Sequence, residues 1–376
     1  MESSIRLFDV RGIAIRMHIT FPLILIWAAL QFGLLSGHGW RGAAFGIVVT
    51  LLLFVIVVLH ELGHSFAALS YGVPVKQVVL LPIGGVAQLG NIPDKPAQEF
   101  VIAIAGPLVN FGLAIVLAAL GIALGQQLGA GQMLATLEGL GRADLSSVFV
   151  YVFASNLFLG IFNLLPAFPM DGGRVLRALL ASRLEYTRAT GIAVAVGRSL
   201  AWLLGLWGFL NGGFFLILIA VFIYVGAGQE GQLVQVRSVL GGLKVVQAYS
   251  RDLQSLSRQS TLREAIDLTL STVQSDFPVC DGERLVGLLP QGRLVEALHR
   301  YGPDVPVGEV MLTDVAPVAP GEALFTVQQR LAESKWDAVP VVEGGRFLGL
   351  LTSREINEVY RLVSSRPGVM SAARSG

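Results

Sequence analysis

The chain has 376 residues, of which 53% are hydrophobic and only 14% are charged, whereas an average soluble protein has about 25% charged residues. The net charge of +1 gives no indication of direct nucleic-acid binding, and the single cysteine, Cys280, excludes an intrachain disulfide and a Cys-based zinc cluster. Charges are sparse from residue 19 to about 229 and then return to ordinary density. We therefore expect a membrane domain over 1–229, a linker over 230–245 and a soluble domain over 246–376.

The N-terminal segment predicts a retained membrane anchor. Residues 5–18 are a short polar lead-in with three arginines, and residues 19–37 contain no charge, a length sufficient to cross a bilayer. No small-residue cleavage site lies early enough for a removed signal peptide, so we interpret this run as the first span. His18 stands at its edge and is interpreted as an interfacial residue, with a metal ligand as the alternative.

The second apolar run, residues 42–71, carries the main chemical signal. It is free of charge up to Leu59 and then contains His60-Glu61-Leu62-Gly63-His64. Ionisable side chains within a membrane helix are costly and need partners. Two histidines four residues apart lie on one face of a helix and can bind one zinc ion, with Glu61 beside them as a candidate base. The alternative is a pair of core histidines with hydrogen-bonded rings.

Residues 72–96 interrupt the helical pattern. Three prolines precede Asp94, and the pair Gly84-Gly85 separates two short β-branched runs. The segment therefore predicts a hairpin or a re-entrant structure, because irregular backbone at membrane depth has to be buried in protein or line a wet cavity. Its strand edge, beside the histidines, could hold an extended peptide by strand addition. An ordinary interfacial loop is the alternative.

Four further spans bring the expected total to six. The third covers 99–124, a loop covers 125–144, and the fourth span covers 145–170. Residues 174–188, with four arginines, are interpreted as a surface helix, and a turn signal at 211–213 divides 189–229 into spans five and six. Asn110 in the third span is either an interhelical hydrogen bonder or a polar group facing the site. Arg198 in the fifth span has no assigned partner.

Positive charges give the orientation of these spans. With six spans, nine lysines and arginines fall on one side of the membrane and two on the other, which predicts cytoplasmic N- and C-termini. The histidine pair and Asp171, which stands where prolines and glycines break the fourth span, then lie at a similar depth near the cytoplasmic side. A catalytic zinc keeps three protein ligands, so Asp171 is the candidate third ligand. The predicted reaction is peptide hydrolysis, with Glu61 transferring the proton.

Together these motifs resemble the site-2 protease family of intramembrane zinc metalloproteases, over about residues 8–228. The resemblance also includes the lead-in at 12–18, Gly106-Pro107-x-x-Asn110, and Asn163-x-x-Pro166 followed by Asp171-Gly172. It implies one Zn²⁺ on His60, His64 and Asp171, with Glu61 as base, and Asn110 and Asn163 as residues that orient the substrate or the reacting oxygen. It also implies a transmembrane substrate that is unwound before cleavage, such as a membrane-tethered sigma or anti-sigma factor.

The soluble domain contains an internal repeat, over about 246–302 and 306–364. Residues 277–279 and 287–289 match residues 339–341 and 349–351, both at an offset of 62 positions. Such paired units resemble a tandem CBS domain, which often binds adenine nucleotides. Thr352 and Glu355 match the hydroxyl and acid of a nucleotide site, whereas the first repeat has Pro290 and Arg293 there. The resemblance implies ATP or another adenine nucleotide at one cleft. A ligand-free module for regulation or homodimerisation is the alternative.

The sequence thus predicts a fold in two parts: an α-helical polytopic membrane domain with a re-entrant β-hairpin-like segment, and a cytoplasmic α/β tandem CBS domain. The predicted function is an intramembrane zinc endopeptidase that cleaves membrane-anchored substrates in the lipid bilayer of the cell, under regulation by the CBS pair. One alternative is a CBS-regulated metal-ion channel or transporter, which would tolerate loss of the Glu61 carboxylate. Another is a catalytically dead scaffold, against which the intact metal ligands argue.

Overall fold

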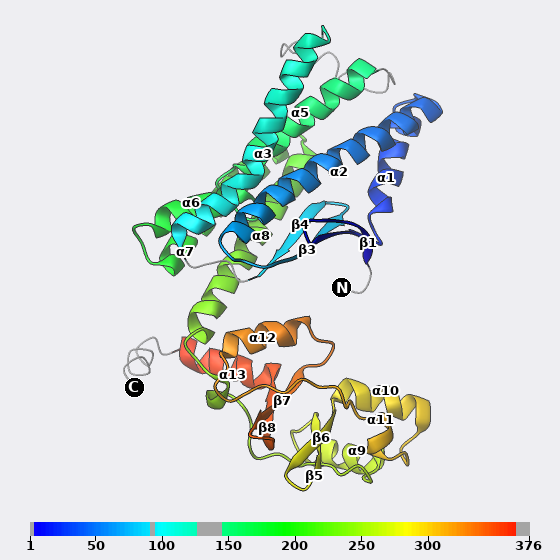
Figure 1. Cartoon of the computed structure of the whole chain (residues 1–376), viewed down its shortest axis with the longest axis vertical. Coiled ribbons are helices and arrows are strands. Elements are labelled where there is room, and N and C mark those ends of the chain that lie inside the picture. Colours follow the sequence, from blue (N-terminus) through cyan, green and yellow to red (C-terminus); the bar gives the residue numbers. More distant parts are fainter. Residues whose placement is uncertain (1–3, 91–94, 126–144, 366–376) are drawn as a thin grey trace. The chain divides into compact units, whose positions relative to one another are not determined.

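The computed structural model describes residues 4–90, 95–125 and 145–365 (Figure 1). The chain divides into two compact units, Met1–Gly231 and Gln232–Gly376, and each unit is described here by itself. The predicted loop at 125–144 lies outside the described residues except for Gly125.

The first unit contains a four-stranded sheet, part of which the sequence did not indicate. β1 (Ser4–Val10) pairs antiparallel with β2 (Ile13–His18), so the expected polar lead-in is a hairpin. β2 pairs in parallel with β3 (Val75–Leu81), and β3 pairs antiparallel with β4 (Gly84–Leu89). The strand order is β1-β2-β3-β4, which leaves β4 as an edge strand. The hairpin expected within 72–96 is therefore one half of a larger sheet.

The first expected span consists of two short helical pieces. α1 (Pro22–Ala29) continues into a π-helical segment, Leu30–Leu35. Together they have 14 residues, which reach about 21 Å at the α-helical rise, against about 30 Å for a hydrocarbon core. The described part of the chain has five helices that are long and apolar enough to cross a membrane, so the predicted count of six is not confirmed.

Five long apolar helices form the body of the first unit: α2 (Gly39–Ser70), α3 (Pro96–Ala123), α5 (Leu145–Asn163), α7 (Tyr186–Leu210) and α8 (Phe214–Leu240). α2 and α3 approach closely where Gly63 faces Ala105. A Cβ at Gly63 would lie 2.9 Å from the Ala105 carbonyl oxygen, nearer than real Cβ atoms come. A small residue is therefore required for the two helices to meet there.

α6 (Asp171–Ala181) follows an irregular connection over residues 164–170. The expected fourth span is shorter than predicted, because α5 ends at Asn163 and the prolines at 166 and 169 lack the N–H donors that a continuing helix needs. A Cβ at Gly173 would lie 2.6 Å from the backbone nitrogen of Phe168, so the connection packs against the first turn of α6. The surface helix expected at 174–188 is wrong in two respects. α6 ends at Ala181, and residues 186–188 belong to α7. Arg177 and Ala178 are also buried.

α8 belongs to both units. Ile223 and Ala227 lie in apolar cores of the first unit, whereas Leu240 lies in a core of the second unit, with Val236 and Val239 packed against it. Residues 230–240, which we expected to form part of a linker, are helical instead. Val234 and Leu240 on this stretch are buried, which stabilises the helix.

The second unit contains two hairpins with the same register. β5 (Phe277–Asp281) pairs with β6 (Arg284–Leu289), and β7 (Ala338–Glu343) pairs with β8 (Arg346–Thr352). In both hairpins the register shifts one residue after the central valine, at Val279 in the first and Val341 in the second. The surrounding helices are α9 (Leu262–Ser271), α10 (Gln291–Tyr301), α11 (Val307–Val310), α12 (Leu324–Glu333) and α13 (Ser353–Ser364), preceded by a 3-10 turn at Val245–Gln247.

Candidate metal centre

His60, His64 and Asp171 meet in the first unit. The two histidines lie one turn apart on α2, and Asp171 is the first residue of α6. The two Nε2 atoms are 3.1 Å apart, and each is 3.1 Å from Asp171 Oδ2. Ligand atoms around a tetrahedral zinc, at about 2.0–2.1 Å from the metal, are separated by about 3.4 Å. The three donors therefore fit one zinc ion with little movement.

Both histidine rings are oriented from α3. His60 Nδ1 is 2.5 Å from Asn110 Oδ1, and His64 Nδ1 is 2.7 Å from the carbonyl oxygen of Ile102. Because a carbonyl oxygen only accepts, each Nδ1 donates and each Nε2 is left with its lone pair toward the ligand group. Asn110 is itself fixed, since its amide donates to Asn156 Oδ1 at 2.9 Å and Asn156 donates to the Asn110 carbonyl at 2.8 Å.

Gly106 occupies the place on α3 where the two imidazoles come closest to its backbone. A Cβ there would collide with His64 Nε2 and would lie 2.8 Å from His60 Cε1. No real side chain fits at that distance, so position 106 has to be glycine if both rings are to keep their positions. This requirement gives the glycine of the Gly106-Pro107 element a physical reason.

Glu61 faces the edge strand β4. Its Oε2 accepts a hydrogen bond from the backbone N–H of Ala87 at 3.2 Å, and a Cβ at Gly85 would lie 2.8 Å from Glu61 Cγ. A cavity of about 320 Å³ lies beside this carboxylate. Its lining includes His60, Asp171, Asn163 and β4 residues. Glu61 and two of the three candidate ligands therefore share a cavity with an edge strand.

The two asparagines singled out from the sequence lie in different surroundings. Asn163 lines the cavity, whereas Asn110 is fully buried and contacts His60. Asn156, which sequence analysis did not single out, completes this arrangement. The sequence contained an indication of Asn156, because a polar side chain inside an apolar span often marks a functional position. The partner could not be read from the sequence, since 46 positions separate Asn156 from Asn110.

Two other polar residues of the membrane unit have local contacts. His18 Nδ1 is 2.7 Å from Thr20 Oγ1, and His18 is not a member of the ligand group. The Arg198 guanidinium on α7 lies 5.1 Å from the centroid of the Tyr224 ring on α8, a cation–π contact.

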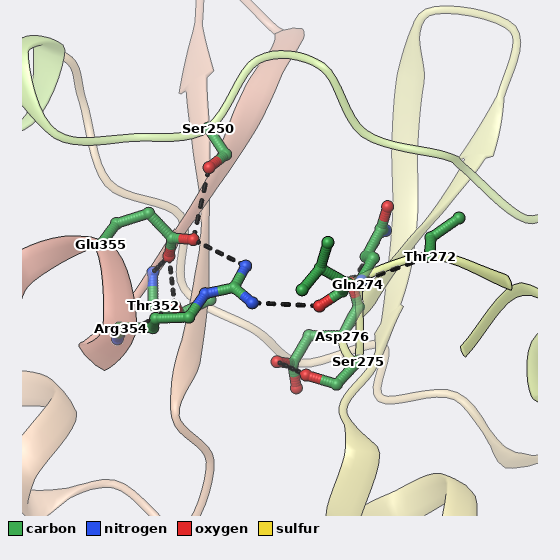
Figure 2. Close-up of polar contacts among 9 residues, drawn as sticks. Ser250, Thr272, Gln274, Ser275, Asp276, Thr352, Arg354 and Glu355 are labelled. Carbon is green, nitrogen blue, oxygen red and sulfur yellow. Dashed lines mark hydrogen bonds and ion pairs between the residues drawn. The ribbon is translucent and has the colours of Figure 1, made fainter. Parts of the chain in front are cut away.

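A second cleft lies in the CBS-like unit, with a volume of about 310 Å³ (Figure 2). Glu355 Oε2 accepts hydrogen bonds from the backbone N–H and the hydroxyl of Thr352. Its Oε1 accepts from Ser250 at 3.3 Å and from Arg354 at 3.1 Å. Burial disfavours the charged carboxylate, but the hydrogen bonds from Thr352 and Arg354 outweigh it and hold the pKa of Glu355 below its usual value. The two predicted nucleotide residues thus bond to each other and cap α13.

Arg354 crosses this cleft. One nitrogen contacts Glu355, and another donates to the carbonyl oxygen of Val273 in the first repeat at 3.0 Å. On the far side, burial raises the pKa of Asp276, which accepts a hydrogen bond from the backbone N–H of Gln291. The cleft therefore has acids on both sides and a guanidinium between them (Figure 2).

Comparison with known proteins gives consistent family matches. The model of peptidase family M50 matches residues 48–204, and the CBS domain model matches residues 307–361. A zinc metalloprotease of Methanocaldococcus jannaschii is 36% identical over 95% of this chain and 96% of its own length. Stage IV sporulation protein FB of Bacillus subtilis is 32% identical over 48% of this chain and 54% of its own. The solved site-2 protease from M. jannaschii is 41% identical, with a TM-score of 0.44 over 61% of this chain and 95% of its own.

Replacing Gly106 by alanine tests the packing against the imidazoles. We expect Gly106→Ala to weaken zinc binding by about 100-fold, the upper end for changes that misplace metal ligands, because the new methyl group displaces the His64 ring. Gly112→Ala on the same helix is the matched control, since a Cβ there meets nothing within 4 Å. Zinc affinity is measured by competition with a chromophoric chelator. Equal affinity in the two variants would contradict the steric argument.

Proposed function

The chain belongs to peptidase family M50, the family of the site-2 proteases, and on this basis we propose that His60, His64 and Asp171 hold its zinc ion while Glu61 acts as its base. The enzyme is a zinc metalloendopeptidase that works within the membrane. The observation that carries the residue assignment is the meeting of three donor atoms, each 3.1 Å from the other two. The channel or transporter alternative is not favoured, since the full-length relative is named a protease.

The chain's own residues supply positioning and proton transfer. When bound, zinc acts as a Lewis acid on the peptide carbonyl and on water. Glu61 shares the cavity with His60 and Asp171, so its carboxylate can take a proton from water and deliver it to the leaving amine. The N–H of Ala87 holds one carboxylate oxygen and leaves the other for this task.

The substrate is a membrane protein, and we assign its scissile segment to the free edge of β4. One edge of β4 pairs with β3, and residues 83–86 line the catalytic cavity. An extended segment added to this strand would satisfy its backbone N–H and C=O groups on protein rather than on hydrocarbon. A transmembrane helix therefore has to unwind before it is cut. Membrane-tethered sigma or anti-sigma factors are substrates of this kind.

Asn110 and Asn163 then have separate tasks. Asn163 lines the cavity and is placed to contact the substrate or the reacting oxygen. Asn110, which lies against His60 and is fully buried, acts on the metal ligand instead.

The CBS pair is the regulatory module in this proposal. We assign an adenine nucleotide to the cleft of Figure 2, where Thr352 and Glu355 present a hydroxyl and an acid and Arg354 supplies a positive charge. The pair also gives the chain a surface for association with a second copy, which the mass of the detergent-solubilised enzyme by light scattering would show. In the proposed orientation, both termini and this module are cytoplasmic.

The variant Glu61→Gln tests the proposed base. It keeps the size of the side chain but removes its basicity, so we expect one bound zinc per chain and a loss of cleavage of about 10²- to 10⁴-fold. Cleavage of a purified single-span reporter and zinc content are measured on the same sample. Asp171→Ala should lose both. Wild-type cleavage by Glu61→Gln would refute the assigned base.

The two asparagines can be separated by their effects. We expect Asn110→Ala to weaken zinc binding by about 10- to 100-fold, because the His60 ring loses its orienting partner. Asn163→Ala should keep the zinc affinity and instead lower kcat or raise KM. The same chelator competition and reporter assay measure both. The opposite pattern would exchange the two assigned roles.

Ligand binding at the CBS cleft is tested with ATP and with AMP, each titrated separately by calorimetry. We expect one of them to bind the wild type and Glu355→Gln to lose at least about 10-fold in affinity, since an acid that pairs with a ligand hydroxyl is removed. Glu358→Gln is the control, because Glu358 is exposed on the same helix. If neither nucleotide binds, the module works without this ligand.

The orientation is tested with a cysteine reporter. Leu270 in the CBS unit is 81% exposed, so we expect Leu270→Cys in a Cys280→Ser chain to react readily with a membrane-impermeant maleimide. A cytoplasmic module predicts labelling in inverted vesicles and none in intact cells. The reverse pattern would place the module outside.

A further inference from the structure

Arg177 forms a buried ionic cluster that neither the metal site nor the proton transfer uses. It is 2% exposed and lies on α6, the helix that begins with Asp171. Its Nε donates to Glu99 Oε1 at 2.7 Å, and a second nitrogen contacts the same oxygen. Its remaining nitrogen donates to Glu230 Oε1 at 2.6 Å. One guanidinium therefore joins α6 to α3, which carries Glu99, and to α8, which carries Glu230.

The same guanidinium also contacts two aromatic rings. Its central carbon lies 4.9 Å from the ring centroid of Phe168 and 5.0 Å from that of Tyr186. Phe168 is fully buried in the connection that leads into Asp171, and Tyr186 begins α7. A planar cation that is held by directed hydrogen bonds and also lies over two aromatic rings has little freedom to turn. Arg177 thus holds both the helix that starts at Asp171 and the segment that precedes it.

The cluster is not explained by stability alone. Buried ion pairs often contribute no more to stability than apolar side chains of similar volume. Here Glu99 is 1% exposed and its Oε2 has no hydrogen-bond partner among the described residues. A buried carboxylate oxygen without a partner is costly. A geometric role for the cluster is therefore the better explanation.

One face of α3 connects this cluster with the two histidines. Glu99, Ile102, Gly106 and Asn110 are spaced by three, four and four positions, so they lie along one face of the helix. Glu99 contacts Arg177, the Ile102 carbonyl holds His64, Gly106 makes room for both imidazoles, and Asn110 holds His60. The stripe that fixes the two histidines thus also anchors the helix that carries the third ligand.

We propose that Arg177 is a positioning residue, which through Glu99 sets the place of Asp171 relative to His60 and His64. This inference rests on the proposed function in one respect, the assignment of Asp171 as a ligand. Glu99 lies on α3 and the two histidines lie on α2, and these two helices pack closely together. A contact with Glu99 therefore fixes the position of Arg177 relative to the histidines. Glu230 adds a second carboxylate contact to the guanidinium from α8.

The test uses the full-length enzyme in detergent and the variants Arg177→Met and Arg177→Met/Glu99→Leu. We expect Arg177→Met to bind zinc about 10- to 100-fold more weakly and to change the visible absorption of the cobalt-substituted enzyme, since the Asp171 carboxylate is no longer held. The double variant removes the stranded carboxylate, so its melting temperature without metal should recover toward wild type. Its zinc affinity and cobalt spectrum should not recover.

The matched control is Arg198→Met, which removes another arginine that stacks on a tyrosine in the same unit. It should bind zinc as the wild type does. Where Arg177→Met does not fold, Arg177→Lys gives the same readout, because lysine keeps the charge but lacks the planar fork. Wild-type zinc affinity and cobalt spectrum in the Arg177 variant would overturn the proposal. Recovery of zinc affinity together with melting temperature in the double variant would also overturn it, leaving a purely structural role.

Asp171→Ala, measured in parallel, separates this proposal from the one on which it rests. Wild-type zinc affinity in Asp171→Ala means that Asp171 is not a ligand, and both proposals then fail. Loss of zinc in Asp171→Ala together with wild-type binding in Arg177→Met leaves the ligand assignment standing and overturns the positioning role alone.

Discussion

Hydrocarbon offers no hydrogen bonds, so every polar atom that a membrane enzyme needs at its centre has to find a partner in the protein itself. The face of α3 that carries Glu99, Ile102, Gly106 and Asn110 meets that demand for the metal centre. It does so with a carboxylate, a backbone carbonyl, an absent side chain and an amide, none of which takes part in the chemistry. The two histidines of α2 find their partners on this neighbouring helix, because it offers a polar atom or an empty position opposite each ring.

Local patterns in the sequence predicted the candidate metal ligands better than they predicted the helices. The spacing of His60 and His64 and the break before Asp171 singled out the three residues that meet in the structure. The depth argument for Asp171 assumed six spans, whereas the described residues show five helices of spanning length and a shorter one. A charge-free run gives the polarity of a segment but not the continuity of its helix, and the run at 19–37 divides into α1 and a π-helical piece.

The features missed from the sequence are non-local. β2 and β3 are separated by the whole of α2, and β1 carries Arg6 and Asp9 among its apolar residues, so it resembles a polar lead-in. Arg177 was grouped with surface arginines because its partner, Glu99, is 78 positions away in the chain, and no pattern near Arg177 indicates this pairing. In the CBS-like unit, by contrast, a local sequence pattern was noticed but has two structural meanings. The Thr352-x-x-Glu355 pattern that suggested a nucleotide site also forms the capping box of α13.

The continuity of α8 has a practical meaning for anyone who wishes to study the protease without its CBS pair. Glu230 stands immediately before the last residue of the first unit, and the helix continues for nine residues beyond that boundary. Cutting the gene at the boundary would leave Glu230 in a terminal turn, where helices fray and carbonyls lack partners. A shortened enzyme that keeps α8 to Leu240 would preserve that turn, although it would then expose Val236, Val239 and Leu240, which the missing domain normally covers. Solubilising substitutions at those three positions, rather than an earlier stop codon, are the rational way to isolate the membrane unit.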